Sequence, residues 1–177
     1  EIVFGTGLNA FITLLEAERL NIEIDYCGVE AYPILQEEFS QLNYSKQLNA
    51  ERKHHLFEEM HKMPWVGRKA LSPNFSLIKK QLFFQDINAQ NSYDLIYFDA
   101  FGARVQSELW TETIFKNMFD ALRENGILVT YSAKGSVRRA MQAVGFKVEK
   151  LPGPPGKREM LRACKEVRHS AIQNKQS

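Results

Sequence analysis

Residues 1–10, with the sequence EIVFGTGLNA, combine the end of an apolar strand, a glycine turn and the start of a helix. Gly5 and Gly7 lack Cβ atoms where the backbone must turn sharply, so a ligand can approach the peptide units. A small residue at Ala10 allows the following helix to pack close to the strand. This combination is typical of sites that hold a nucleotide-like cofactor through the backbone. We therefore expect a cofactor to be bound by Phe4, Gly5, Thr6, Gly7, Leu8 and Asn9.

A second apolar run, IDYCGVE at residues 24–30, ends at Glu30, twenty positions beyond Ala10. A carboxylate at this position can accept hydrogen bonds from both hydroxyls of a ribose. The combination of glycine turn and carboxylate favours a cofactor site over a simple tight turn. The spacing fits two cofactors, a pyrophosphate dinucleotide and S-adenosylmethionine, and this part of the chain leaves both open.

The composition is typical of one ordinary domain with a substantial core, since 44% of the 177 residues are hydrophobic and 25% are charged. No run of eighteen apolar residues occurs, so we expect no membrane span. Cys27 and Cys164 show no metal or redox spacing, which favours a reducing, cytoplasmic location. His54, His55 and His61 lie in a charged stretch that predicts a surface helix, and the ligand spacing predicts no metal site there.

The charge is unevenly distributed, although the formal net charge is only +2. Residues 1–133 contain 12 Lys and Arg against 18 Asp and Glu, whereas residues 134–168 contain 10 against 3. Such a split predicts a basic face that suits a phosphate-bearing partner, with a solvated lysine-rich surface as the alternative.

The hydrophobic pattern predicts an α/β fold in which strands and helices alternate. We expect helices over residues 8–20, 34–42, 108–122 and 136–144, and strands over 1–4, 24–30, 75–87, 93–101, 127–132, 146–151 and 157–165. The polar residues 43–75 predict an insertion or cap. Because the first strand is so short, we expect an N-terminal part of the native chain to be missing.

The last two predicted strands would form a hairpin across the proline-fixed loop 152–156. Six parallel strands followed by an antiparallel one predict a mostly parallel, seven-stranded sheet. This is the Rossmann-like fold of class I S-adenosylmethionine-dependent methyltransferases. A dehydrogenase would usually continue into a substrate domain at this point.

Ligands of a doubly wound sheet bind beyond the carboxyl ends of its parallel strands. This rule places the glycine turn at the same edge as Glu30, Asp86, Asp99 and Lys134. By chemistry, Glu30 would hold the ribose and Asp86 the adenine amino group. Asp99, which is followed by Phe101, would lie where the cofactor presents its methyl group. For Asp86 or Asp99 taken singly, a strand-end cap is the alternative.

Four segments resemble the methyltransferase domain of the MnmC/MnmD family. They are FGTGLN at 4–9, DAF at 99–101 with ELWT at 108–111, YSAKGSVRR at 131–139, and GPPGKREML at 153–161. The similarity covers nearly all of residues 1–165, and the last two motifs are the most specific. The sequence departs from the family at residues 102–104, Gly-Ala-Arg, where a proline is common, and it lacks the family's N-terminal extension.

The resemblance implies methylation, with S-adenosylmethionine, of the aminomethyl group on the wobble uridine of tRNA, which gives 5-methylaminomethyl-(2-thio)uridine. It implies a methyltransferase domain over residues 1–165, with 166–177 as a polar tail. A flavin-dependent oxidoreductase, fused or separate, is an expected partner.

For the reaction itself, we expect Asp99 to orient the substrate amine and accept its proton. Phe101 could stack on the flipped uracil. The expected phosphate contacts come from Lys134, Arg138, Arg139, Lys157 and Arg158. For Arg158, an ion pair with Glu159 is the alternative.

Three other functions remain open on the sequence alone. The chain could be a small-molecule methyltransferase with the same cofactor site, an NAD-binding oxidoreductase domain, or a non-catalytic RNA-binding domain. The joint presence of the glycine turn, Glu30, Asp86 and Asp99 disfavours the last, because a binding module needs no cofactor chemistry.

Overall fold

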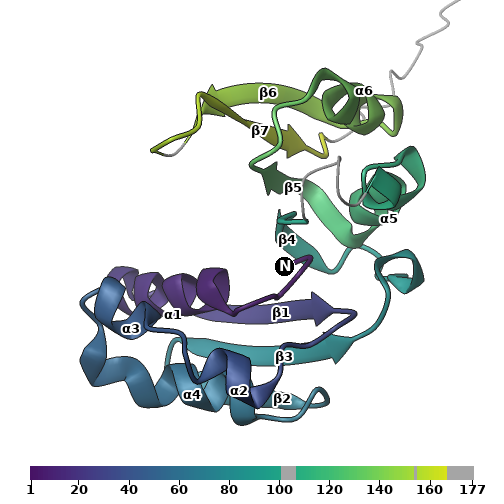
Figure 1. Cartoon of the computed structure of the whole chain (residues 1–177). Coiled ribbons are helices and arrows are strands. Elements are labelled where there is room, and N and C mark those ends of the chain that lie inside the picture. The colour runs from purple at the N-terminus through teal and green to yellow at the C-terminus, as the bar shows by residue number, and fades with distance from the viewer. Residues whose placement is uncertain (101–106, 154, 167–177) are drawn as a thin grey trace, which may run out of the picture. The chain divides into compact units, whose positions relative to one another are not determined.

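The computed structural model describes residues 1–100, 107–153 and 155–166 (Figure 1). The chain forms two compact units, Glu1–Ile87 and Asn88–Ser177, and each has a sheet of its own. No helix among the described residues has the length and apolar character needed to cross a bilayer.

The first unit contains a three-stranded sheet in the order β1-β3-β2 (Figure 1). β1 (Ile24–Glu30) and β3 (Phe75–Gln81) are parallel and in register over their whole length. β2 (Arg68–Ser72) is antiparallel to β3. Residues 1–4 run parallel to β1 as expected, but they form only one bridge, between Ile2 and Val29, instead of a full strand.

Helix α1 (Leu8–Leu20) packs on β1 and β3. Its inner face consists of four side chains with no exposed surface, at the spacing of one helical stripe: Ala10, Phe11, Leu14 and Ala17. Helix α4 (His54–Lys62) lies beside β2 and buries Leu56, Phe57 and Met60. The remaining elements of the unit are short: α2 (Gln36–Phe39), α3 (Tyr44–Gln47), and 3₁₀ turns at Glu51–Lys53 and Phe84–Asp86.

Three expectations for this unit are corrected. The helix predicted over 34–42 shortens to α2, which has no buried residue to hold a longer helix in place. The strand predicted over 75–87 ends at Gln81, because its partner β1 ends at Glu30. Residues 43–75, for which no strand was expected, contain β2, because the largely exposed side chains of β2 give no strand pattern.

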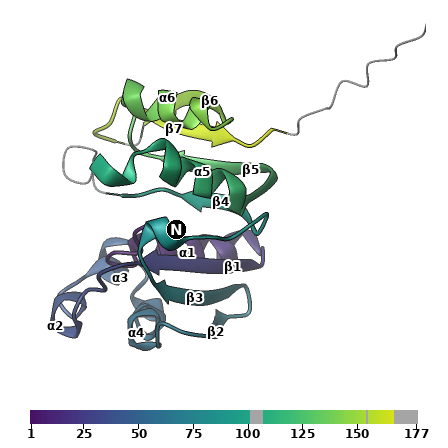
Figure 2. The same ribbon diagram turned by 90° about the vertical axis from the view of Figure 1, so that its right-hand side faces the viewer.

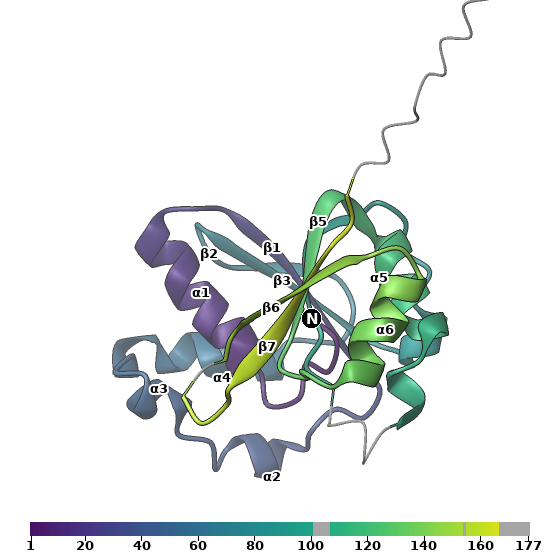
Figure 3. The same cartoon turned by 90° about the horizontal axis from the view of Figure 1, so that it is seen from above.

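The second unit contains a four-stranded sheet in the order β4-β5-β7-β6. β4 (Tyr93–Tyr97) is parallel to β5 (Leu122–Thr130), whereas β7 (Glu159–Cys164) is antiparallel to both β5 and β6 (Lys147–Pro152). The predicted antiparallel last strand and the terminal hairpin are thus confirmed. Helices α5 (Glu112–Ala121) and α6 (Gly135–Ala143) lie on one side of this sheet (Figures 2 and 3), and a 3₁₀ turn at Ser107–Leu109 precedes α5.

An aromatic cluster fills the core of the second unit where β4 meets α5. The Phe98 ring centroid lies 5.1 Å from that of Trp110 and 5.2 Å from that of Phe115. All three side chains are buried. The cluster holds the chain immediately before Asp99. The single seven-stranded sheet expected from the sequence would join both units and stays a prediction.

Candidate functional site

The glycine turn has the backbone conformation that the sequence indicates. The φ angle is +52° at Gly5 and +72° at Gly7, in the left-handed region that favours glycine. A Cβ atom on Gly7 would also lie 3.1 Å from Nε2 of His61. Both the conformation and the packing of the turn therefore require a residue without a side chain at position 7.

Glu30 is bonded directly to the glycine turn. Its side chain is 6% exposed, and its two carboxylate oxygens accept hydrogen bonds from the backbone N–H groups of Gly5 and Tyr32, each at 3.0 Å. A carboxylate offers about four acceptor positions, so these two bonds leave capacity for ribose hydroxyls. The structure brings the turn and Glu30 together, and the ribose contact stays a prediction.

Other predicted cofactor-binding residues anchor the turn to the rest of the first unit. The hydroxyl of Thr6 lies 3.0 Å from that of Tyr44 on α3, and Asn9 Nδ2 donates to the Glu1 carboxylate at 2.8 Å. Phe4 is 2% exposed and packs over the backbone of Gly28, whereas Leu8 begins α1 in a half-buried position.

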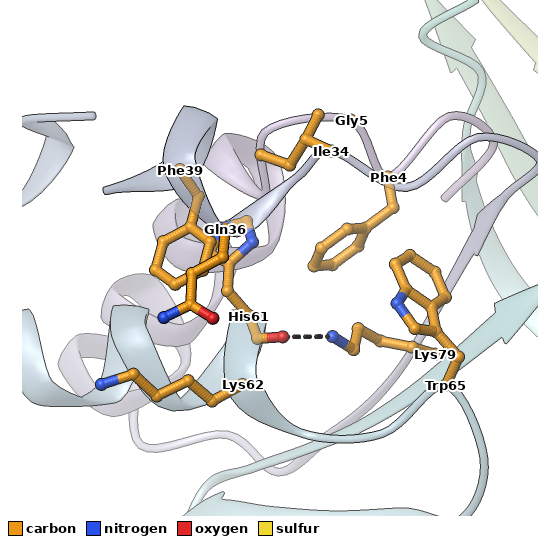
Figure 4. A pocket seen from close by; sticks show the side chains of 9 residues that line it. All are labelled: Phe4, Gly5, Ile34, Gln36, Phe39, His61, Lys62, Trp65 and Lys79. Atoms are coloured by element: carbon orange, nitrogen blue, oxygen red, sulfur yellow. Dashed lines mark hydrogen bonds between the residues drawn. The ribbon is translucent and has the colours of Figure 1, made fainter. Parts of the chain in front are cut away.

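A pocket of about 200 Å³ opens beside the glycine turn (Figure 4). Among the residues that the structure describes, its walls carry mainly aromatic and basic side chains and no carboxylate: Phe4, Gly5, Ile34, Gln36, Phe39, His61, Lys62, Trp65 and Lys79. Lys79, on β3, is 1% exposed, and its ammonium group donates to the carbonyl of His61 at 3.0 Å. The same group lies 4.6 Å from the Trp65 ring centroid. Burial lowers the pKa of Lys79 to about 8.

The predicted surface helix is only partly exposed, because His61 on α4 is half-buried. Whereas His54 and His55 are exposed, the His61 ring stacks on Phe39 at 4.7 Å. Burial, aided by the charge of Lys79, lowers the pKa of His61 to about 4, so the ring is neutral at pH 7. α4 turns this residue toward the pocket because His61 follows the buried Phe57 and Met60 on the helix. No cluster of three or more potential metal ligands occurs within the described ranges.

The sequence did not lead us to predict a functional role for the pocket residues on β3 and α4. Phe75, Leu77 and Lys79 alternate along β3, and all three side chains are almost completely buried. That period-2 pattern could have shown that Lys79 belongs to the inner face of the strand. Asp86, in contrast, is exposed in a 3₁₀ turn five positions beyond the end of β3, so its expected place at a strand end is wrong.

In the second unit, Asp99 and Tyr131 follow two adjacent parallel strands. Tyr97 on β4 pairs with Val129 on β5, so both residues lie two positions beyond that pair. Asp99 is half-buried and Tyr131 is 40% exposed. Burial and the charge of Asp99 raise the pKa of Tyr131. Lys157, in the β6–β7 loop, places its ammonium group 4.9 Å from the Tyr131 ring centroid. Three segments thus meet at one end of this sheet.

The five predicted phosphate-binding residues are all exposed. None of them forms an ion pair with another residue in the described part of the chain, whereas Lys147, Lys150 and Arg162 pair with Glu166, Glu159 and Glu149. Glu159 pairs with Lys150 at 2.8 Å, and the alternative ion pair between Arg158 and Glu159 does not occur among the described residues. Phe101 lies outside the described residues. Glu30 and Asp99 lie in different units, so the expectation that they share one edge of a sheet stays a prediction.

Comparison with known proteins identifies similar sequences over most of the chain. Residues 47–166 match a family model described as S-adenosyl-L-methionine-dependent methyltransferase. The chain is 29% identical over 174 residues to the "tRNA 5-methylaminomethyl-2-thiouridine biosynthesis bifunctional protein MnmC" of Idiomarina loihiensis. It is 28% identical over 176 residues to the protein of the same name from Aeromonas hydrophila. Each match covers 91% of this chain, and the chain spans about a quarter of the length of these relatives.

Solved structures show the same fold. The MnmC2 structure from Aquifex aeolicus has a TM-score of 0.66 at 23% sequence identity, over 92% of this chain and 51% of that one. A methyltransferase from Pyrococcus furiosus has a TM-score of 0.54 at 17% identity, over 89% of this chain and 70% of that one. The predicted α/β methyltransferase-like fold is thereby confirmed.

Proposed function

Because this chain belongs to the family of S-adenosyl-L-methionine-dependent methyltransferases, we propose that it methylates the aminomethyl nitrogen of the wobble uridine in tRNA. The observation that carries the proposal is the arrangement at one end of the second sheet. There, half-buried Asp99 and the exposed ring of Tyr131 lie with Lys157, which has no ion pair among the described residues. The printed names of the MnmC relatives refer to this modified nucleoside in tRNA.

The first unit fits the methyl donor. A Cβ atom on Gly5 would contact only Val3, at 3.8 Å from its Cγ1, so it is the positive φ of the turn that favours glycine there. Glu30 is held at the turn with acceptor capacity for ribose hydroxyls. We assign the adenine amino group to Asp86, which is exposed and accessible. S-adenosylmethionine supplies an electrophilic methyl group on its sulfonium.

The acceptor amine needs deprotonation and alignment. A primary alkylamine is mostly protonated at neutral pH, and its nitrogen has no lone pair for attack until the proton leaves. In our proposal the Asp99 carboxylate orients the amine and accepts that proton. Alignment can contribute several of the roughly 7–11 kcal/mol available to such effects. Phe101, two positions beyond Asp99 in the sequence, would stack on the flipped uracil.

We extend the proposal to the organisation of the whole protein. Residues 1–165 would form one methyltransferase domain with a mostly parallel, seven-stranded sheet, in which 43–75 is an insertion or cap, and 166–177 a polar tail. A flavin-dependent oxidoreductase, fused or separate, would prepare the substrate, in line with the word "bifunctional" in the relatives' names. A cytoplasmic location suits the tRNA substrate and the unbridged Cys27 and Cys164.

Labelled S-adenosylmethionine and tRNA from cells that lack the modification test this function. We expect label in the wobble nucleoside of tRNA that carries 5-aminomethyl-(2-thio)uridine, and none in tRNA whose wobble uridine is unmodified. Transfer to a small amine without any dependence on tRNA would favour a small-molecule methyltransferase. Binding of NAD in place of S-adenosylmethionine would favour an oxidoreductase domain.

A further inference from the structure

Tyr131 is an exposed aromatic side chain at the end of the second sheet where Asp99 follows β4. It follows β5 directly and is 40% exposed. Within the described part of the second unit, the other large hydrophobic side chain with comparable exposure is the aliphatic Leu95. The ring contacts the ammonium group of Lys157, which has no ion pair among the described residues. An exposed ring beside such a cation is typical of sites where nucleic-acid bases stack.

The strand register places Tyr131 beside the reaction centre proposed above. Asp99 lies two positions beyond Tyr97, the last residue of β4, and Tyr131 lies two positions beyond Val129, directly after the end of β5. Tyr97 and Val129 are partners, so Asp99 and Tyr131 are neighbours at the end of the sheet. The charge of Asp99 acts on the Tyr131 phenol, which agrees with this placement.

One face of the Tyr131 ring is covered by Lys157 at 4.9 Å. An exposed cation–π contact contributes about 0.5–1 kcal/mol. Stacking of a nucleobase on an aromatic side chain contributes about 1–3 kcal/mol. A base can therefore displace the ammonium group of Lys157 from the ring, and the released cation is then available to a phosphate.

We propose that the wobble base stacks on Tyr131, in addition to the stacking on Phe101 proposed above, and that Lys157 moves from the Tyr131 ring to a backbone phosphate when tRNA binds. The inference rests on the proposed function, and it adds a positioning residue on the acceptor side. Stacking at Tyr131 places the base beside Asp99, within reach of its carboxylate for the aminomethyl arm. The ring, and not the phenol hydroxyl, performs this role.

Two RNA probes separate stacking from charge. One is an anticodon stem-loop with 5-aminomethyluridine at the wobble position, and the other lacks the base at that position. Tyr131→Leu should weaken binding of the first RNA by about ten-fold or more in fluorescence anisotropy. It should leave binding of the abasic RNA unchanged. Tyr131→Phe should retain wild-type binding of both. Lys157→Gln should weaken binding of the RNA that carries the base more than binding of the abasic RNA, because only a stacked base releases Lys157 from the ring.

Leu95→Ala serves as the control, because this side chain is 46% exposed on β4 of the same sheet and has no assigned role. Affinity for S-adenosylhomocysteine should stay within two-fold in every variant. The inference is overturned if Tyr131→Leu binds both RNAs like the wild type, or loses both equally. A wild-type protein that fails to methylate tRNA would instead overturn the proposed function.

Discussion

At the scale of single residues, Lys79 carries a charge in a costly position. Its ammonium group is buried among Trp65, Phe4 and the carbonyl of His61, and the described residues offer it no carboxylate. A buried cation without an ionic partner is destabilised relative to water. This explains the direction of its pKa shift, from 10.5 to about 8.

The pH dependence of stability should report this cost. Since the unfolded chain binds the Lys79 proton more tightly, the free energy of unfolding should rise as the pH increases from about 8 toward 10.5. The stability gained by deprotonation of Lys79 is lost as the pH falls through about 8. Urea denaturation of Lys79→Met should lack this rise, whereas the exposed neighbour substitution Lys80→Met should retain it. Equal slopes of unfolding free energy against pH in the wild type and in Lys79→Met would show that the charge of Lys79 is compensated.

Glu30 should matter for both stability and cofactor binding. In Glu30→Gln an amide NH₂ replaces one acceptor oxygen and opposes a backbone N–H of Gly5 or Tyr32. We expect a loss of about 1–3 kcal/mol in unfolding free energy. Calorimetry should show at least ten-fold weaker S-adenosylhomocysteine binding. Glu37→Gln, on an exposed position of α2, is the matched control and should change neither quantity.

Asp99 should affect chemistry far more than cofactor binding. Asp99→Asn keeps the size of the side chain but cannot accept the amine proton, so the rate of methyl transfer in single-turnover experiments should fall by about 10²-fold or more. Affinity for S-adenosylhomocysteine should remain within a few-fold. Full turnover by this variant would remove Asp99 from the proposed mechanism.

At the scale of elements, packing between Phe4 and β1 fixes the glycine turn. A Cβ atom on Gly28 would lie 2.3 Å from Cδ2 of Phe4, so Gly28→Ala must displace the ring that precedes Gly5. We expect thermal denaturation to show a loss of about 1–3 kcal/mol, together with weaker cofactor binding. Gly135→Ala is the control, since the nearest atom there is the flexible guanidinium of Arg139. Wild-type behaviour of Gly28→Ala would mean that the turn does not depend on this contact.

The elements also show what the sequence can and cannot predict. α1 and β1 have the predicted bounds. The glycine turn begins α1, and Asn21, with a positive φ of 53°, ends it before β1 begins. The end of β3 depends on where β1 stops, which is information from a partner strand. For the same reason the pocket beside Gly5 was not predicted: His61, Trp65 and Lys79 come together only through tertiary packing.

At the scale of the whole molecule, the basic C-terminal third should produce a strong salt dependence. Arg138 and Arg139 on α6 have no ion pair among the described residues, whereas Lys147 is paired with Glu166 at 2.6 Å. Replacing both arginines by Gln should reduce the slope of log affinity for tRNA against log salt by about 1–2, since each phosphate contact contributes roughly 0.7–0.9. Lys147→Gln should leave the slope unchanged. An unaltered slope in the double variant would assign tRNA binding to another surface.

We propose that this chain transfers a methyl group from S-adenosylmethionine to a wobble nucleoside of tRNA. Mass spectrometry of wobble nucleosides from cells with and without this protein tests it most directly. We expect cells that lack the protein to accumulate the unmethylated 5-aminomethyl nucleoside and to lose its methylated form. Unchanged levels of the 5-methylaminomethyl nucleoside in those cells would contradict it.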